Sequence, residues 1–208
     1  GLRREIRVLG RHQAWTSLIL MFMLMIGQMV PFTYIAPLLL DVTRLDSATV
    51  PWVLLLNGVG STVGVFLGGR LSGWKPMEAT IGLIVMQVGV LVGFYITAPY
   101  AAPLIVILFI WGCLNFAIGA LIQTRILTWT ADAPNLASAL IPSGFNIGIA
   151  FAAFAGATML NAGYGYRDLP LLGVAAMTIA TFVAIVSYLQ ERTAGETPPM
   201  SPAEAMAN

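Results

Sequence analysis

Residues 79–124 read ATIGLIVMQVGVLVGFYITAPYAAPLIVILFIWGCLNFAIGALIQT, a run of 46 residues without Asp, Glu, Lys or Arg. A helix rises about 1.5 Å per residue and needs about 20 apolar residues to cross the hydrocarbon core of a bilayer. The run is therefore too long for one membrane helix. Pro99 and Pro103 stand near its middle and indicate a turn. We predict two spans joined there, at residues 79–98 and 103–124.

Uncharged runs of similar length fill most of the remaining chain, and charged residues separate them. The predicted spans are residues 14–38, 47–69, 79–98, 103–124, 135–160 and 169–190. Residues 1–13 form a cytoplasmic segment before the first span. The tail at 191–208 is rich in Pro, Ala, Glu and Thr and is predicted to be disordered. The chain begins with Gly1 rather than Met, which we interpret as the sign of a fragment, a processed product or a shortened expression product.

The composition excludes several classes of protein. Of the 208 residues, 58% are hydrophobic and only 9% are charged, whereas an ordinary soluble domain has about 25% charged residues. A soluble enzyme and a disordered chain are excluded, and the net charge of +1 argues against a nucleic-acid partner. One Cys and one His cannot form a disulfide framework or a Cys/His zinc cluster. We predict an all-α integral membrane protein that has a lipid bilayer as its surroundings and needs no metal or cofactor.

The basic residues are distributed unevenly between the two sides of the membrane. Six spans place both chain ends on one side, and eight of the ten basic residues fall on that side. The eight are Arg3, Arg4, Arg7, Arg11, Arg70, Lys75, Arg125 and Arg192, and the other two are Arg44 and Arg167. Short cytoplasmic loops carry an excess of Lys and Arg. Both termini are therefore predicted to be cytoplasmic.

The second and fifth spans share a pattern in which an amide is followed by small residues at every fourth position. The members are Asn57, Gly60, Gly64 and Gly68 in the second span and Asn146, Gly148, Ala152 and Gly156 in the fifth. Small residues four apart lie on one face and let helix backbones approach closely. The pattern fits two three-helix repeats, an architecture known in transporters. Coincidence is the other interpretation, because Gly and Ala are common in membrane helices.

Uncharged polar residues inside the spans are candidates for lining an aqueous cavity. A buried amide is costly in hydrocarbon unless it finds a partner or water. The candidates are Gln28, Tyr34, Asn57, Ser61, Asn115, Ser143 and Asn146. Hydrogen bonding between helices is the alternative for the amides and serines, and an interfacial anchor is the alternative for Tyr34. Gln87 in the third span does not fit this set of candidates, and we interpret it as a hydrogen-bonding residue buried in lipid. No span has a charged residue near its centre, so we predict no catalytic residue and no proton-relay carboxylate.

Four segments, in order, resemble the C-terminal half of a major facilitator superfamily transporter, most closely the bacterial drug and sugar efflux permeases of the drug:proton antiporter type. The segments are FTYIAPLL (32–39), NGVG with GGRL (57–60 and 68–71), QTR to ASA (123–139) and FNIGIA (145–150). The resemblance implies a six-helix half that lines a central cavity with its first, second, fourth and fifth helices. It implies efflux of a small molecule by alternating access across a bacterial inner membrane. It also implies a partner, either the missing N-terminal half or a second copy.

One loop departs from the family. After such an eighth helix the family often has Gly-x-Leu-Ala-Asp-Arg, whereas residues 69–75 here read GRLSGWK. Gly73 stands in place of the acid and Trp74 in place of the base, so the loop lacks the carboxylate that often caps a neighbouring helix in that family. A second hypothesis for the whole chain is a self-standing six-span protein that dimerises into a pore or a small transporter. An intramembrane enzyme is not favoured, because the spans carry no Ser/His pair, paired aspartates or metal cluster.

Overall fold

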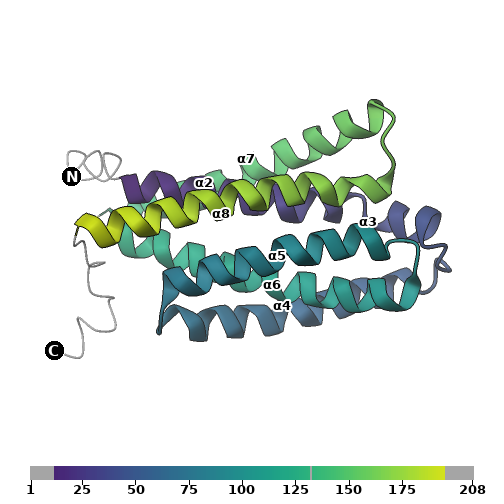
Figure 1. Ribbon diagram of the computed structural model, residues 1–208, viewed down its shortest axis with the longest axis horizontal. Helices are drawn as coiled ribbons and strands as arrows, with labels where there is room; N and C mark the ends of the chain where they lie inside the picture. The colour runs from purple at the N-terminus through teal and green to yellow at the C-terminus, as the bar shows by residue number, and fades with distance from the viewer. Residues whose placement is uncertain (1–11, 132, 195–208) are drawn as a thin grey trace.

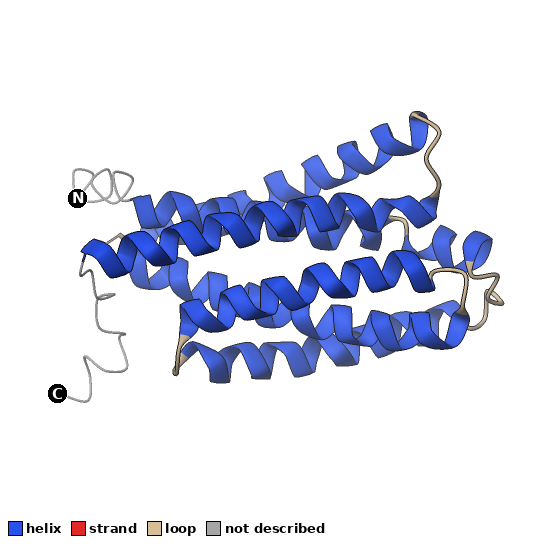
Figure 2. Ribbon diagram, viewed as in Figure 1, coloured by secondary structure: helices blue, strands red, loops and turns tan. Residues whose placement is uncertain are grey.

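The computed structural model describes residues 12–131 and 133–194, and within these ranges it contains helices and no strand (Figures 1 and 2). The long helices are α2 (His12–Thr33), α4 (Val50–Ser72), α5 (Pro76–Thr97), α6 (Ala101–Trp129), α7 (Pro134–Asn161) and α8 (Leu169–Ala194). All six are long and apolar enough to cross a membrane, which confirms the predicted all-α membrane fold. Each corresponds to one predicted span, with ends that differ by up to about five residues.

The first span is interrupted near its end. α2 ends at Thr33, and Tyr34 has backbone angles of φ −112° and ψ 17° that are not helical. A short helix α3 (Ile35–Pro37) and a π-helical turn η1 (Leu38–Val42) follow. Pro37 has no N–H to donate to the carbonyl of Thr33, and its ring crowds that carbonyl, so the helix breaks one turn before the proline.

The long helices form two layers. α7, α2, α6 and α4 lie side by side in that order, while α8 packs on α2, α5 packs on α6, and α5 and α8 pack on each other (Figure 1). In chain order, α2, α4 and α5 make one group of three and α6, α7 and α8 make the next. The second helix of each group packs on the first helix of the other group, and so does the third. The two groups of three helices therefore have the same arrangement, which supports the internal repeat predicted from the sequence.

The glycine stripes lie where helix backbones approach most closely. A Cβ atom at Gly60, Gly64 or Gly68 of α4 would lie less than 3.0 Å from a backbone oxygen of α6. On α7, a Cβ atom at Gly148 would lie 2.5 Å from the Cβ of Met25 on α2. Both stripes therefore serve the helix packing for which small residues at every fourth position are suited.

The loops that follow α3 and α7 meet at one end of α5. The Arg167 side chain, in the 3-10 turn η2 (Tyr166–Asp168), donates from Nε to the Tyr95 carbonyl at 3.0 Å, and its guanidinium lies 4.7 Å from the centre of the Tyr95 ring. Thr43 Oγ1 donates to the Ala98 carbonyl at 2.7 Å. The last turn of α5 is thus the common attachment point for one loop from each repeat.

Gly64→Ala is expected to lower the free energy of unfolding by about 1–3 kcal/mol, because the new methyl group would overlap the Cys113 carbonyl, which belongs to a helix and cannot move alone. Gly58→Ala in the same helix is the matched control. Nothing lies within 4 Å of a Cβ atom there, and alanine favours a helix over glycine by roughly 0.5–1 kcal/mol. Thermal unfolding in detergent, followed by circular dichroism, measures both. Equal melting temperatures would contradict the close approach of α4 to α6.

Candidate functional site

The seven residues predicted to line a cavity fall into two groups in the structure. Asn57 and Asn115 are buried between helices, with 7% and 2% of their surface exposed. The other five have accessible surface and lie on helices of the α7–α2–α6–α4 layer or directly after α2. They are the half-buried Gln28, Tyr34 and Ser61 and the exposed Ser143 and Asn146.

Asn57 bridges α4 and α6. Its Nδ2 donates to the backbone carbonyl of Leu108 at 2.8 Å. Gly112 makes room for the amide, because a Cβ atom at that position would lie 2.6 Å from Asn57 Nδ2. Ser61 Oγ in turn donates to the Asn57 carbonyl at 2.9 Å, one turn along α4. Within this chain the Asn57 side chain therefore bonds one helix to the other.

Asn146 has a different environment from Asn57, although the two occupy similar places in the repeat. Successive residues of a helix are rotated by about 100°. Asn57 precedes Gly60 by three residues, which places it within about 60° of the glycine stripe and so on the packed face. Asn146 precedes Gly148 by two residues, a rotation of about 200°, and so lies on the opposite face of α7. The one-residue offset explains why Asn57 is buried and Asn146 is exposed.

Asn115 is paired with the one amide that fitted no pattern in the sequence. Gln87 on α5 is fully buried, and its Nε2 donates to Asn115 Oδ1 on α6 at 2.9 Å. The remaining amide atoms, Gln87 Oε1 and Asn115 Nδ2, are buried without a hydrogen-bond partner. The pair therefore joins α5 to α6 inside the bundle, away from any exposed helix face.

Four of the five accessible candidates lie on two neighbouring helices or directly after one of them. Gln28 lies on α2, and Ser143 and Asn146 lie three residues apart on one face of α7. Tyr34, just beyond α2, packs its ring over Gly156 of α7, and its hydroxyl donates to the Ala153 carbonyl at 3.4 Å. α2 and α7 pack along each other. Gln28 and Tyr34 therefore lie on the α2 side of this contact, while Asn146 lies on the face of α7 that is turned away from α2.

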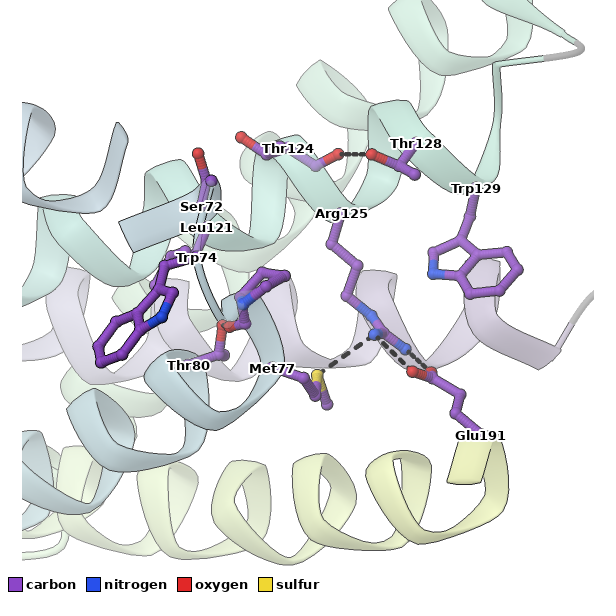
Figure 3. Close-up of a pocket in the computed structure, with 12 residues that line it drawn as sticks. Ser72, Trp74, Met77, Thr80, Leu121, Thr124, Arg125, Thr128, Trp129 and Glu191 are labelled. Carbon is purple, nitrogen blue, oxygen red and sulfur yellow. Dashed lines mark hydrogen bonds and ion pairs between the residues drawn. The ribbon is translucent and has the colours of Figure 1, made fainter. Parts of the chain in front are cut away.

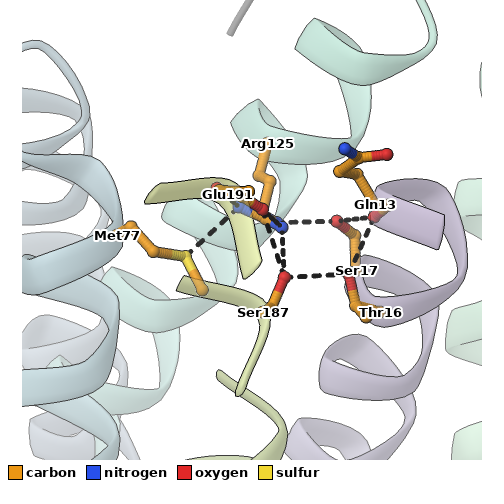
Figure 4. Close-up of polar contacts among 7 residues, drawn as sticks. All are labelled: Gln13, Thr16, Ser17, Met77, Arg125, Ser187 and Glu191. Atoms are coloured by element: carbon orange, nitrogen blue, oxygen red, sulfur yellow. Dashed lines mark hydrogen bonds and ion pairs between the residues drawn. The ribbon is translucent and has the colours of Figure 1, made fainter. Parts of the chain in front are cut away.

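A second polar centre, which the sequence did not predict, lies where α2 and α5 begin and α6 and α8 end (Figure 4). Arg125 near the end of α6 forms an ion pair with Glu191 near the end of α8. The Nη2–Oε1 distance is 2.5 Å and the Nη1–Oε2 distance is 3.4 Å. The two side chains are only 9% and 13% exposed. A forked arrangement of this kind matches the geometry of a guanidinium to that of a carboxylate.

Arg125 also contacts the two other helices that meet at this end. Its Nε donates to Ser17 Oγ on α2 and its Nη2 to Ser187 Oγ on α8, each at 2.9 Å, while Nη1 lies 3.2 Å from the Met77 sulfur on α5. Both serine hydroxyls donate further hydrogen bonds. Ser17 donates to the Gln13 carbonyl at 2.7 Å, and Ser187 donates to Glu191 Oε1 at 3.1 Å. The guanidinium therefore holds groups from α2, α5, α6 and α8 around one charge.

A cavity of about 290 Å³ opens beside this ion pair (Figure 3). It lies between the α4–α5 loop, the first turn of α5 and the last turns of α6. Among its lining side chains are Trp74, Met77, Thr80, Thr124, Arg125 and Glu191. The Arg–Glu pair forms part of the wall, so the cavity combines an aromatic ring and hydroxyls with a charge pair that is neutral overall.

The sequence contained one signal that points to this centre. The charge count places Arg125 on the cytoplasmic side, and the predicted end of the last span places Glu191 at the start of the tail. Glu191 follows Ser187 by four residues, however, which puts both on one face if the helix continues. α8 does continue, to Ala194.

A membrane bundle of two three-helix repeats, with neutral polar groups on one layer and no charge near the middle of a span, has the architecture of one half of a secondary transporter. Curated proteins of this class are similar to the chain. It is 28% identical over 189 residues to the inner membrane transport protein YdhP of Escherichia coli (strain K12), covering 89% of the chain and 48% of YdhP.

The names of two further relatives state a family and an activity. The chain is 32% identical to the uncharacterized MFS-type transporter YtbD of Bacillus subtilis (strain 168), over 65% of the chain and 35% of YtbD. It is 31% identical to a chloramphenicol resistance protein of Streptomyces lividans, over 77% of the chain and 41% of that protein. No protein-family profile matches the chain. These similarities confirm the resemblance to major facilitator superfamily transporters. The chain spans about half the length of the curated relatives it matches, which is consistent with one half of such a transporter.

Gln87→Leu is expected to destabilise the protein by about 1–3 kcal/mol, because Asn115 Oδ1 then loses its partner while it stays buried. The double variant Gln87→Leu with Asn115→Leu removes both polar groups and is expected to recover part of that loss. Melting temperatures of the two single variants and the double variant complete the cycle. A double variant that loses the sum of the two single effects would show that the amides are not coupled.

Proposed function

We propose that the chain is one half of a bacterial efflux permease of the major facilitator superfamily, which carries a small neutral molecule across the inner membrane by alternating access. The observation that carries this proposal is the similarity over 89% of the chain to a transporter of which it spans 48%. In this proposal the six helices move as one wall of a central cavity against a second six-helix half. Chemistry on the substrate forms no part of it.

The proposed cavity wall consists of the predicted residues that have accessible surface, Gln28, Tyr34, Ser61, Ser143 and Asn146, while Asn57 and Asn115 support it from behind. None of these side chains carries a charge. A wall of amides, hydroxyls and an aromatic ring recognises its ligand by hydrogen bonds and dispersion. The substrate we propose is therefore a small amphipathic or sugar-like molecule.

The uncovered faces of α4 and α7 support a partner that covers these two helices. An apolar stretch of 18 residues is 28% buried in α4 and 22% buried in α7, whereas the corresponding stretch of α2 is 56% buried. Large apolar side chains stand out from both helices, for example Phe66 with 75% and Phe154 with 69% of its surface exposed. We propose that the missing N-terminal half covers part of these faces and that lipid covers the rest.

Both chain ends are proposed to be cytoplasmic. The first turns of α2 and the last turns of α8 lie at the same end of the bundle, where Thr16 Oγ1 and Ser187 Oγ are 3.3 Å apart. The excess of basic residues assigned to that side supports a cytoplasmic position.

A second copy of the same chain is the alternative to a missing half, and the mass of the native polypeptide distinguishes the two. An antibody against residues 191–208 detects the polypeptide in membranes of its source. A band near twice 22.2 kDa indicates a transporter that contains both halves in one chain. A band at 22.2 kDa would favour the self-standing protein that dimerises into a pore or small transporter.

In the complete transporter, Asn146→Leu is expected to change the rate or selectivity of export while leaving stability nearly unchanged, because Asn146 is exposed on α7. Asn57→Leu is expected to alter export as well, together with a loss of stability, because its bond to Leu108 joins two helices. Thr178→Val is the control, since Thr178 is exposed on the outer helix α8 and bonds only to its own helix. Export from loaded vesicles, normalised to folded protein, measures the effect. Unchanged export by the Asn146 variant would contradict the proposed wall.

A further inference from the structure

Three buried side-chain atoms lack a hydrogen-bond partner among the described residues, and all three belong to α5 and α6. They are Gln87 Oε1, Asn115 Nδ2 and Trp111 Nε1, on side chains with at most 2% of their surface exposed. Asn115 and Trp111 are four residues apart, so they share a face of α6 and lie about 6 Å apart along its axis. Gln87 is bonded to Asn115. The unused hydrogen-bonding groups of the described side chains are therefore concentrated in one part of the bundle.

Contacts between α2 and α6 fix the register of the two helices beside these atoms. The Phe32 ring of α2 packs against the Trp111 ring of α6, with 6.4 Å between the ring centres. Leu24, about two turns earlier on α2, lies 3.7 Å from the position of a Cβ atom at Gly119, about two turns later on α6. The two helices therefore run antiparallel.

This register places the unused atoms at the level of the proposed cavity wall. Gln28 lies midway between the two contact residues of α2, and Asn115 lies midway between the two contact residues of α6. The two amides are therefore level with each other on neighbouring helices. Gln28 is half-buried, whereas Asn115 is buried. The unused atoms thus lie one layer beneath the accessible surface that Gln28 contributes to.

Two donors and one acceptor define the chemical group that such a site can hold. A hydroxyl accepts hydrogen bonds through its lone pairs and donates its own proton, so it can accept from Asn115 Nδ2 and Trp111 Nε1 and donate to Gln87 Oε1. An ammonium group cannot accept from the donors, and a carboxylate cannot donate to the acceptor. Turning over both amides exchanges the residues that supply the free donor and the free acceptor but leaves one of each.

We propose that Gln87, Asn115 and Trp111 form a hydroxyl-binding site inside the bundle, which takes either a water molecule or one hydroxyl of a sugar-like substrate that is bound against Gln28. A bound hydroxyl completes the hydrogen bonding of all three side chains. For the substrate hydroxyl the inference rests on the proposed function, and it adds Trp111 and Gln87 of the outer helix α5 to the residues that determine specificity. Since the three side chains are buried, a substrate hydroxyl reaches them only when neighbouring side chains move aside.

Ultraviolet resonance Raman spectra of the complete transporter test the site, because an indole ring mode changes frequency when Nε1 donates a hydrogen bond. The difference between the spectra of the wild type and Trp111→Phe isolates the signal of Trp111. Trp52→Phe is the matched control, since Trp52 is 70% exposed near the start of α4. Spectra are recorded without ligand and with glucose or lactose as probes.

We expect the Trp111 signal to be that of a hydrogen-bonded indole. If this signal is present without ligand, water supplies the hydroxyl, and if it appears only with a sugar, the substrate supplies it. The Trp52 signal is expected to be the same with and without the probes. An indole signal without a hydrogen bond under every condition would overturn the site.

A second variant tests the site without altering the indole. Gln87→Leu with Asn115→Leu removes the two amides that hold the hydroxyl, so the Trp111 signal is expected to change to that of an indole without a hydrogen bond. A signal that stays hydrogen-bonded in this double variant would show that another group accepts from Nε1, and it would overturn the site.

Transport separates this inference from the proposed function. Where the Trp111 signal requires a sugar, Trp111→Phe is expected to raise the KM for that sugar severalfold, while Trp52→Phe leaves it unchanged. An unchanged KM in Trp111→Phe would overturn the substrate hydroxyl. A hydrogen-bonded Trp111 in protein that exports none of the tested compounds would count against the proposed function and not against the site.

Discussion

The close approach of α4 to α6 is the contact on which the arrangement of the bundle depends. In lipid, helices gain little from burying apolar side chains against one another, because the surrounding chains are equally apolar. Association then requires backbones near enough for dense dispersion contacts, and a stripe of Gly60, Gly64 and Gly68 permits this. Because α4 is bound through one narrow stripe, the rest of its circumference stays uncovered. The uncovered side is what a second half or the lipid must meet.

A stripe of small residues also packs α7 against α2 in the second repeat. Whether the amide near each stripe is buried or exposed depends on a spacing that differs by one residue. Glycine stripes were visible in the sequence, and so were the six spans, because both follow from helical period and bilayer thickness. The placement of Asn57 and Asn146 follows from the same period only when it is measured against the stripes. An amide three residues before the stripe is drawn into the helix seam, and an amide two residues before it is turned outward. Two amides at similar positions of a repeat can therefore differ, so that one packs between helices and the other is exposed.

The polar pairs inside the bundle could not be predicted from the sequence, because each depends on how two helices are rotated against each other. Gln87 and Asn115 are 28 residues apart, and Arg125 and Glu191 are 66 residues apart. The second pair also depends on the length of α8. The polar composition after residue 190 predicted a tail, yet Leu189, Gln190, Glu191 and Arg192 are all good helix formers, and the first proline comes only at Pro198. At this position helix propensity predicts the observed end of α8 at Ala194 better than polarity does.

The distribution of charge limits what this half can contribute to transport. The described ionic contacts lie at the two ends of the bundle, Arg125 with Glu191 at one end and Arg167 over Tyr95 at the other. Between them the buried polar groups are amides, and even the Gln87–Asn115 pair leaves one acceptor and one donor unused at a cost of about 1–3 kcal/mol each. Retaining such a pair is consistent with a role in setting the register of α5 against α6. Under the proposed function, such a neutral middle suits the binding of an uncharged substrate. If that export is driven by protons, we expect the carboxylate that titrates within the membrane to belong to the proposed second half.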